Sequence, residues 1–369
     1  MRLLAKLFGR FTGTLVILAA SAWGALALVY ASPLTEPLRS LLAGLFGLSG
    51  IVAAVVVLFS RRRWKAAGAF AFAFLLLLAW WSTIQPSNNR DWQPEVAVLP
   101  YATIDGDLIT LHNIRNFEYR SETDFTPAYY DKTLDLRRLD SVDLIATYWM
   151  GPQIAHIMLS FGFAGQDYMA FSIETRKERA EGYSTLKGLF RQYELFYVVS
   201  DERDVIRVRT NYRKDPPEDV YLFRTRGPTE NARRLFMEYV RKINALKEHA
   251  EFYNTLTTNC TMNIFMHTRV NPGHMPFNWK VLLSGYTPEY VYDNGRLDTS
   301  LPFEDLKKRS RINEAARAAD RAPDFSLRIR EGLPGMKITK IAPRWIPPPF
   351  KLIFTHRNDW TQRLSCCTV

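Results

Sequence analysis

Three long apolar stretches without a single charge occupy most of the first 84 residues and constrain the fold more than any other feature. They cover residues 11–31, 41–60 and 66–84. An α-helix needs roughly 20 apolar residues to cross a hydrocarbon core of about 30 Å, and each stretch has about that length. The first stretch also has the basic start of a secretory signal, but a signal peptide needs no second or third span. We therefore interpret residues 1–87 as a transmembrane anchor.

The distribution of basic residues predicts the orientation of this anchor. Residues 1–10 carry three Lys or Arg and residues 61–65 carry four, whereas the segment 32–40 carries only Arg39. Lys and Arg collect on the cytoplasmic side of membrane proteins. The N-terminus is then cytoplasmic, and three crossings place everything after Ile84 outside. In a bacterium this predicts a multi-pass protein of the inner membrane with its C-terminal domain in the periplasm.

The net charge of the chain is +11, and part of it comes from the residues that flank the apolar stretches. No DNA- or RNA-binding motif accompanies this excess, so no nucleic-acid partner is expected. The remaining basic residues suit a surface that faces anionic lipid headgroups. The membrane is therefore the partner that the charge pattern predicts.

The region after the anchor contains strand-like patterns and then helix-like patterns, which predicts an α+β fold. Short β-rich runs come first, at residues 96–120, 141–150, 155–163, 168–176, 195–210 and 219–226. An amphipathic helix follows over residues 228–249, with Thr229 as its cap, and a second helix opens at Cys260. We expect a catalytic domain with an antiparallel sheet and packed helices over residues 88–300. An extension over residues 301–369 is expected to pack on the domain or to lie near the membrane.

Strand alternation predicts that two polar side chains meet on adjacent strands. His156 shares a face with Met158 and Ser160, since successive side chains of a strand point to opposite faces. If residues 164–166 form a three-residue hairpin loop, counting back from it brings His156 directly opposite Glu174. A carboxylate would then lie beside an imidazole that a rigid element holds.

Cys260 stands where a polar run turns into an apolar stretch, at the predicted start of a helix. The positive end of the helix dipole and the free backbone N–H groups favour thiolate over thiol at such a position. A thiolate nucleophile needs a base and acid partner, and a third group fixes the tautomer of that partner. Cys260, His156 and Glu174 supply these three roles. Tyr253 or Asn259 would add a hydrogen bond to a developing oxyanion.

The cysteines and histidines of the chain also allow a structural role or metal binding. A lone cysteine is often a small buried apolar residue and a strand histidine is often a core residue, so a purely structural role stays open. His267 and His274 match no zinc spacing, and Cys366 and Cys367 lack partner ligands. We therefore expect no metal and no cofactor. With three cysteines in the chain, one thiol must stay unpaired, which excludes a disulfide framework.

The order of the candidate residues resembles a known superfamily. A histidine on a strand, an acidic residue on the next strand, a helix, and then Asn-Cys at a helix start are similar to the circularly permuted branch of the NlpC-type papain-like superfamily. A closer resemblance is to the bacterial family called the Lnb N-terminal periplasmic domain. It rests on stretches between Asn88 and Cys260, among them NNRDW, NIRNFEYR, FSIETRKERAEGYSTLKGLFRQYELFYVVSDERDVIRVRT and FYNTLTTNC.

For that family the resemblance implies lipoprotein N-acylation. An acyl group leaves a phospholipid for the thiol of Cys260 and then passes to the α-amino group of a lipoprotein, with His156 as base and then acid. The implied partners are a phospholipid, a lipoprotein and the membrane. Two alternatives stay open: a cell-wall amidase or peptidase that uses the same Cys–His dyad, and a non-catalytic membrane-tethered periplasmic domain.

Four further polar residues lie in the resembling stretches: Arg115, Asn116, Arg176 and Lys177. A functional role would be to bind a phosphate or carboxylate of the substrate. Charged strand residues more often form surface pairs, so we expect salt bridges within the sheet for Arg115 and Arg176.

Overall fold

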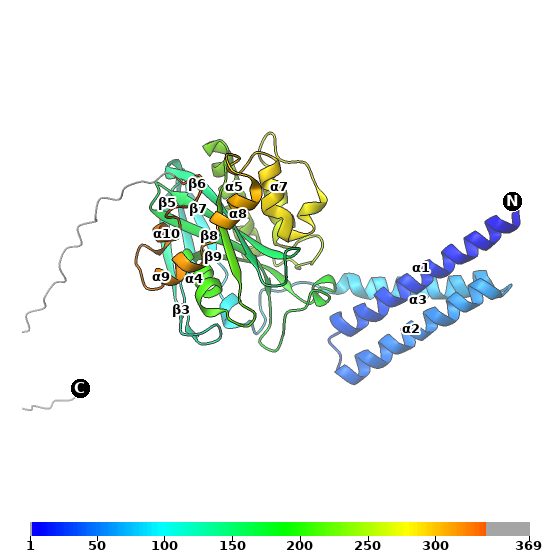
Figure 1. Ribbon diagram of the computed structural model, residues 1–369. Coiled ribbons are helices and arrows are strands. Elements are labelled where there is room, and N and C mark those ends of the chain that lie inside the picture. The colour runs from blue at the N-terminus through cyan, green and yellow to red at the C-terminus, as the bar shows by residue number, and fades with distance from the viewer. Residues whose placement is uncertain (1, 337–369) are drawn as a thin grey trace, which may run out of the picture. The chain divides into compact units, whose positions relative to one another are not determined.

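The computed structural model describes residues 2–336. Its first elements are the helices α1 (Arg2–Ala31), α2 (Glu36–Phe59) and α3 (Arg63–Thr83), drawn in blue to cyan in Figure 1. Each helix is long and apolar enough to cross a membrane, which confirms the predicted three-helix region. The predictions for the tail after Met336, including Cys366 and Cys367, lie outside the described residues.

Helices α1 and α2 pack closely because small residues face each other between them. A methyl group added at Gly50 would collide with Ser21, and one added at Gly24 would collide with Phe46. Small residues let helix backbones approach each other in a membrane, where no hydrophobic force drives helices together. The Ser21 hydroxyl also donates to the carbonyl oxygen of Gly47 at 3.2 Å. These contacts make α1 and α2 a packed pair.

An eight-stranded sheet forms the centre of the domain that follows the anchor. Its order is β1-β2-β9-β8-β7-β6-β10, and β5 pairs with β2 on a branch. Every pair is antiparallel except β2 with β9, so the predicted antiparallel sheet is confirmed apart from that pair. The strands are β1 (Tyr101–Asp105), β2 (Leu108–Arg115), β5 (Tyr129–Asp135), β6 (Leu139–Tyr148), β7 (Ala155–Phe163), β8 (Asp167–Arg176), β9 (Glu194–Asp201) and β10 (Asp219–Arg224), and β3 (Glu118–Tyr119) pairs with β4 (Phe125–Thr126) in a small separate sheet.

The β7–β8 hairpin has the predicted loop and register. Phe163 pairs with Asp167 across a three-residue loop, and the register continues without a shift up to Met158 with Ser172. A slip of one residue would move every side chain of a strand to the other face. This register therefore places His156 on the same face of the sheet as Ser172.

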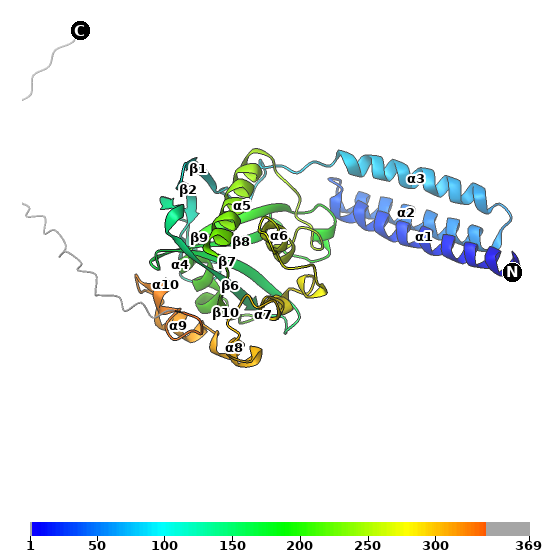
Figure 2. The ribbon, with the colours of Figure 1, turned by 90° about the horizontal axis from the view of Figure 1, so that it is seen from above.

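Helices cover both faces of the sheet (Figures 1 and 2). One face is covered by α5 (Thr229–Glu248), α6 (Cys260–Thr268) and α7 (Thr287–Asp293), and the other by α4 (Glu202–Arg207), α9 (Asn313–Ala318) and α10 (Phe325–Arg328). Pro228 holds the N-cap position of α5, so the prediction of Thr229 as its cap is wrong. The strand patterns predict strands with one buried and one exposed face. All nine residues of β7 are buried instead, because helices cover both of its faces.

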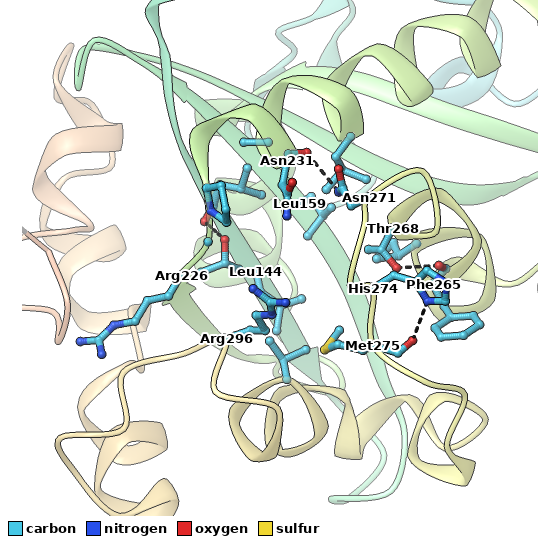
Figure 3. Close-up of a pocket in the computed structure, with 18 of the residues that line it drawn as sticks. Leu144, Leu159, Arg226, Asn231, Phe265, Thr268, Asn271, His274, Met275 and Arg296 are labelled. Atoms are coloured by element: carbon cyan, nitrogen blue, oxygen red, sulfur yellow. Dashed lines mark hydrogen bonds between the residues drawn. The ribbon is translucent and has the colours of Figure 1, made fainter.

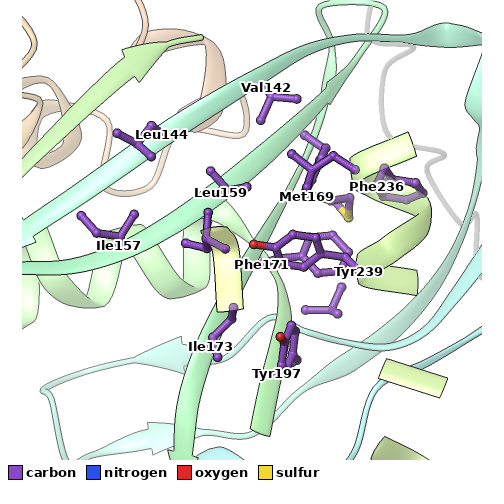
Figure 4. Close-up of a cluster of buried hydrophobic side chains, with 14 of the residues drawn as sticks. Val142, Leu144, Ile157, Leu159, Met169, Phe171, Ile173, Tyr197, Phe236 and Tyr239 are labelled. Atoms are coloured by element: carbon purple, nitrogen blue, oxygen red, sulfur yellow. The ribbon is translucent and has the colours of Figure 1, made fainter. Parts of the chain in front are cut away.

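Apolar side chains from α5 fill the larger core. Phe236 and Tyr239 contact Phe171 of β8, with ring centroids 5.9 Å and 5.3 Å apart, in the cluster of Figure 4. Burying aromatic side chains of this size stabilises the fold by roughly 1.5–3 kcal/mol each. The core therefore holds α5 firmly on the strands that carry His156 and Glu174.

The prediction of one strand over residues 195–210 is wrong in its second half. β9 ends at Asp201, whose side chain accepts a hydrogen bond from the backbone N–H of Arg203 and caps α4. Glu202 and Asp204 in this helix are fully buried. Their partners are Arg330 and Arg115, which lie more than 80 residues away in the chain. A local pattern cannot reveal such partners.

The described part of the C-terminal extension packs on the domain. Residues up to Met336 form one compact unit, which includes α8 (Phe303–Arg309), α9 and α10. Arg330 is buried and donates to Asp143 and to Glu202. The sheet and the residues after position 300 are therefore joined by buried ion pairs.

Candidate functional site

Cys260 is the first residue of α6, as predicted. The Asn259 side chain caps this helix: its Oδ1 accepts from the backbone N–H of Met262 at 2.8 Å, and its Nδ2 donates to the carbonyl oxygen of Thr255 at 2.8 Å. These bonds fix the Asn259 side chain in the cap. The cap places the thiol at the positive end of the helix, where thiolate is favoured.

Strands β7 and β8 separate next to this helix start. Their paired residues end at Met158 and Ser172, although β7 continues back to Ala155 and β8 continues on to Arg176. The separation leaves the backbone N–H of Ile157 without a partner on β8. This N–H instead bonds the sulfur of Cys260.

The structure brings Cys260, His156 and Glu174 together at this separation. The Nε2 atom of His156 lies 3.1 Å from Oε1 of Glu174. It also lies 2.6 Å from Oγ of Ser172, whose hydroxyl donates to the same Glu174 oxygen at 2.6 Å. Nε2–H therefore points to the serine and the carboxylate, and Nδ1 is the ring nitrogen left for the thiol. The sequence analysis assigned no role to Ser172, although strand alternation puts it on the same face as Glu174.

The thiolate form of Cys260 and the imidazolium form of His156 stabilise each other. Burial alone raises the pKa of Cys260, but the hydrogen bond and the positive charge of His156 lower it below its usual value. Burial likewise opposes the charged form of His156, yet Glu174 and the hydrogen bond to Cys260 raise its pKa to about 9. A thiolate–imidazolium pair is therefore favoured near neutral pH.

A second ion pair, with Arg209, stabilises the negative charge of Glu174. Arg209, which is buried, lies 3.3 Å from Oε1 of Glu174 and 3.3 Å from Glu218, and Arg213 holds Glu218 at 2.9 Å. Burial opposes ionisation of Glu174, but His156 and Arg209 hold the pKa of its carboxyl well below the usual value. Sequence analysis missed Arg209, because it lies in the segment predicted as a strand.

Two tyrosine hydroxyls lie near the thiol. Tyr253 is buried, and burial followed by the charge of Cys260 raises its pKa. Tyr239 of α5 is fully buried, and its pKa is raised by the same two causes. Among residues 2–336 its hydroxyl has no hydrogen-bond partner. The sequence analysis predicted an amphipathic helix over residues 228–249 and gave Tyr239 no role. The one available signal was a hydroxyl on the apolar face of that helix.

An apolar cavity of about 180 Å³ lies beside α6 (Figure 3). Its walls include Leu144 and Leu159 from the sheet and Ile264 from α6. Thr261, the residue after Cys260, also lines it, whereas Cys260, His156 and Glu174 do not. A dry cavity of about 150 Å³ is enough to bind a small apolar molecule.

His267, the histidine of α6, has a structural environment. Nε2 of His267 lies 2.8 Å from the hydroxyl of Tyr197, and its ring packs against Tyr239 with centroids 4.6 Å apart. Burial lowers the pKa of His267 to about 4. His267 is therefore a neutral core residue at neutral pH.

The four further polar residues have structural contacts. Arg115 forms a salt bridge, as predicted, but its partner is buried Asp204 of α4 at 2.6 Å rather than a residue of the sheet. Arg176 instead donates to the carbonyl oxygens of Val96 and Ala97, so the salt bridge predicted for it is wrong. It holds the segment after the anchor against the sheet. Asn116 and Lys177 use their backbone groups to bind Ala128 and Gln93.

Replacing Glu174 with Gln tests the charge support of the site. The change removes the group that most raises the pKa of His156, and burial and Arg209 then favour the neutral imidazole. Loss of the His156 charge outweighs loss of the smaller repulsion between Glu174 and the thiolate. Alkylation of Cys260 by iodoacetamide at pH 7 should slow about tenfold. Glu178→Gln, on a half-buried carboxylate that pairs with Arg90, is the control, and equal slowing in both variants would contradict the prediction.

The fold and the site define an α+β domain with a Cys–His–Glu constellation, preceded by three helices that can cross a membrane. Residues 125–285 match the family model of the Lnb N-terminal periplasmic domain, which supports the resemblance to this family. The matched range contains Cys260, His156 and Glu174 but begins after NNRDW and NIRNFEYR. Neither a curated protein nor a solved structure matches the chain. The match and the apolar helices together indicate a membrane protein with a periplasmic domain.

Proposed function

We propose that the protein is a multi-pass inner-membrane thiol acyltransferase that transfers an acyl group from a phospholipid to a lipoprotein in the periplasm. The observation that carries this proposal is the hydrogen-bonded series His156–Ser172–Glu174 with the thiol of Cys260 beside His156. Its members provide a nucleophile, a base and acid, and a group that orients the base.

The distance to the membrane supports a lipid substrate. α3 ends at Thr83, and the backbone N–H of Ser87 already donates to Oε1 of Glu194 at the start of β9. Four residues span at most about 14 Å, so this end of the domain stays near the membrane surface. Glu194 forms a bridge with Phe252, just ahead of the loop that leads to Cys260. The nucleophile therefore lies on the side of the domain that is tied to the anchor.

The geometry fits a two-step transfer. In the first step the Cys260 thiolate attacks the ester carbonyl carbon, an S–C bond forms, and the C–O bond to the glycerol oxygen breaks as Nδ1 of His156 gives that oxygen its proton. In the second step an amine attacks the thioester carbon and the C–S bond breaks. Nδ1 takes the proton of the amine, which restores the ion pair. The apolar cavity beside α6 supports an acyl group as the part transferred.

The test uses the full-length protein in vesicles of phospholipid with an isotope-labelled acyl chain. Intact mass spectrometry should show one acyl group on the protein, which hydroxylamine removes and which Cys260→Ala does not carry. A peptide with the free N-terminus of a lipoprotein should then receive the label.

Each other outcome of this test has a defined meaning. Release of free fatty acid alone would indicate a hydrolase. Cleavage of purified muropeptides without any acyl-enzyme would indicate the amidase or peptidase alternative. The catalytic proposal would be overturned if no acyl-enzyme, fatty acid or cleaved muropeptide forms and Cys260 reacts no faster than an ordinary thiol.

A further inference from the structure

Large apolar side chains are exposed on four segments of the domain, namely residues 149–154, 183–188, 253–258 and 275–286. Each of their most prominent members is between 40% and 68% exposed. We call this set the apolar collar, and it consists of Met150, Leu186, Leu256, Phe277, Trp279 and Leu282. Exposed apolar groups that cluster in this way mark an interaction surface.

Hydrogen bonds join two of these segments directly. The backbone N–H of Gly285 donates to the carbonyl oxygen of Gln153 at 2.9 Å, and the N–H of Ala155 donates to Oγ of Ser284 at 2.9 Å. A methyl group at Gly285 would collide with the backbone of Pro152 and Gln153, so this approach requires glycine. Segments 149–154 and 275–286 are therefore neighbours beside the start of β7, which carries His156.

The other two segments are joined in the same way. The Thr255 hydroxyl donates to the carbonyl oxygen of Thr185 at 2.8 Å. The backbone N–H of Thr255 donates to the carbonyl oxygen of Gly188 at 3.2 Å. Residues 253–258 lead directly into Cys260. The collar therefore surrounds the end of the sheet at which Cys260 and His156 meet.

The collar and the membrane tether lie on the same end of the domain. Glu194, which binds Ser87 in the tether, pairs with Phe252 immediately before the third collar segment. Arg191, three residues after the second collar segment, donates to the carbonyl oxygen of Ile84 at 3.1 Å. The collar thus continues the surface that the four-residue tether holds near the membrane.

Charge favours a lipid surface as the partner. The four collar segments contain two lysines, Lys187 and Lys280, and no Asp or Glu. Lys280 pairs with Glu289 and Asp293 of α7, so Lys187 is the collar lysine that can meet headgroups. Basic residues near a membrane attract anionic headgroups, and Trp and Tyr side chains favour the interfacial region. Trp279 packs against Tyr286 with ring centroids 5.3 Å apart, so both rings lie in one part of the collar.

We propose that the apolar collar inserts into the outer leaflet of the membrane that holds the anchor, so that the opening to Cys260 faces the lipids. The occupant of the surface is thus a phospholipid bilayer. This docking requires no turnover and therefore stands or falls separately from the catalytic proposal.

The test is photolabelling of the full-length protein in vesicles that contain a phospholipid with a diazirine in its acyl chain. Peptides that cover residues 253–258 and 275–286 should carry at least five times the label of the β1–β2 hairpin. That hairpin is the internal control, because Ile104 and Leu108 are also about half exposed. The hairpin contacts Asp135 and Leu136, and the neighbouring Arg138 binds the β7–β8 loop. The hairpin therefore lies toward the end of β7 that is opposite to His156.

Two double variants complete the test. Trp279→Glu with Leu282→Glu should reduce collar labelling to the level of the hairpin, whereas Ile104→Glu with Leu108→Glu should leave it unchanged. Iodoacetamide labelling of Cys260 in detergent should match the wild type in both, which shows that the site is intact. Collar labelling no higher than that of the hairpin, or protection of the collar only when another protein is added, would overturn the proposal. Cys260→Ala should retain full collar labelling even if acyl transfer is disproved.

Discussion

Acylation of Cys260 in the His156→Ala variant is expected to be about 10²–10⁴-fold slower than in the wild type, the range for loss of a general acid–base group. Two effects combine in this variant. The leaving glycerol oxygen loses its proton donor, and the thiol loses the hydrogen bond and the charge that lower its pKa. Burial and the charge of Glu174 then raise the pKa of Cys260 above its usual value, so the thiolate disappears at pH 7.

The pH profile separates these two effects. The rate of Cys260 alkylation in the wild type should reach its plateau below the usual pKa of a thiol, and in His156→Ala it should still be rising above pH 9. At high pH the variant should recover alkylation but not acyl transfer, because only the transfer needs a proton donor. Quenched-flow mass spectrometry measures both rates.

His112→Ala is the matched control for this prediction. Nδ1 of His112 lies 2.7 Å from Asp131, so the control also removes a histidine paired with a carboxylate, but one on β2 rather than on β7 or β8. Its acylation rate should stay within about twofold of the wild type. An equal loss in both variants would mean that His156 acts through folding alone.

Replacing Arg330 with Met should lower the free energy of unfolding of the domain by about 3–5 kcal/mol, the usual effect of removing one member of a buried ion pair. Arg330 donates to Asp143 at 2.9 Å and to Glu202 at 2.7 Å, and all three side chains are buried. Met keeps much of the volume but, among residues 2–336, leaves Glu202 with only the hydroxyl of Ser160 as a partner. The melting temperature should fall by roughly 6–20 °C.

Arg328→Met is the control within the same turn. Its guanidinium pairs with Asp324 on an exposed surface, where such pairs contribute at most about 1 kcal/mol. Thermal unfolding in detergent, followed by near-ultraviolet circular dichroism, should show a clear drop for Arg330→Met and almost none for Arg328→Met. Equal melting temperatures would show that the buried ion pairs of Arg330 do not stabilise the domain.

Local sequence patterns were sufficient for the elements that carry the site. Alternation along β7 and β8 and the count across the loop predicted the register observed between Phe163 and Met158. The change from a polar run to an apolar stretch predicted a helix start at Cys260. These predictions succeed because a side chain's direction within one strand or hairpin follows from backbone geometry alone.

Patterns of the same kind failed where a distant partner decides the structure. α4 was predicted as strand because its apolar residues resemble one, but buried Glu202 and Asp204 bind arginines from other parts of the chain. Arg209 was missed for the same reason. A buried carboxylate is stable only with a charged partner, and sequence order does not say which arginine arrives there.

The sequence by itself therefore determined the three long apolar helices, the strand register and the helix that begins at Cys260, because each depends on residues within one or two neighbouring elements. Only the tertiary structure decided that β7 and β8 separate beside Cys260, that Ser172 lies between His156 and Glu174, and that an apolar collar surrounds them. Those features depend on which surfaces of distant segments are buried together, and burial sets both the free energy of each contact and the pKa of the groups it encloses.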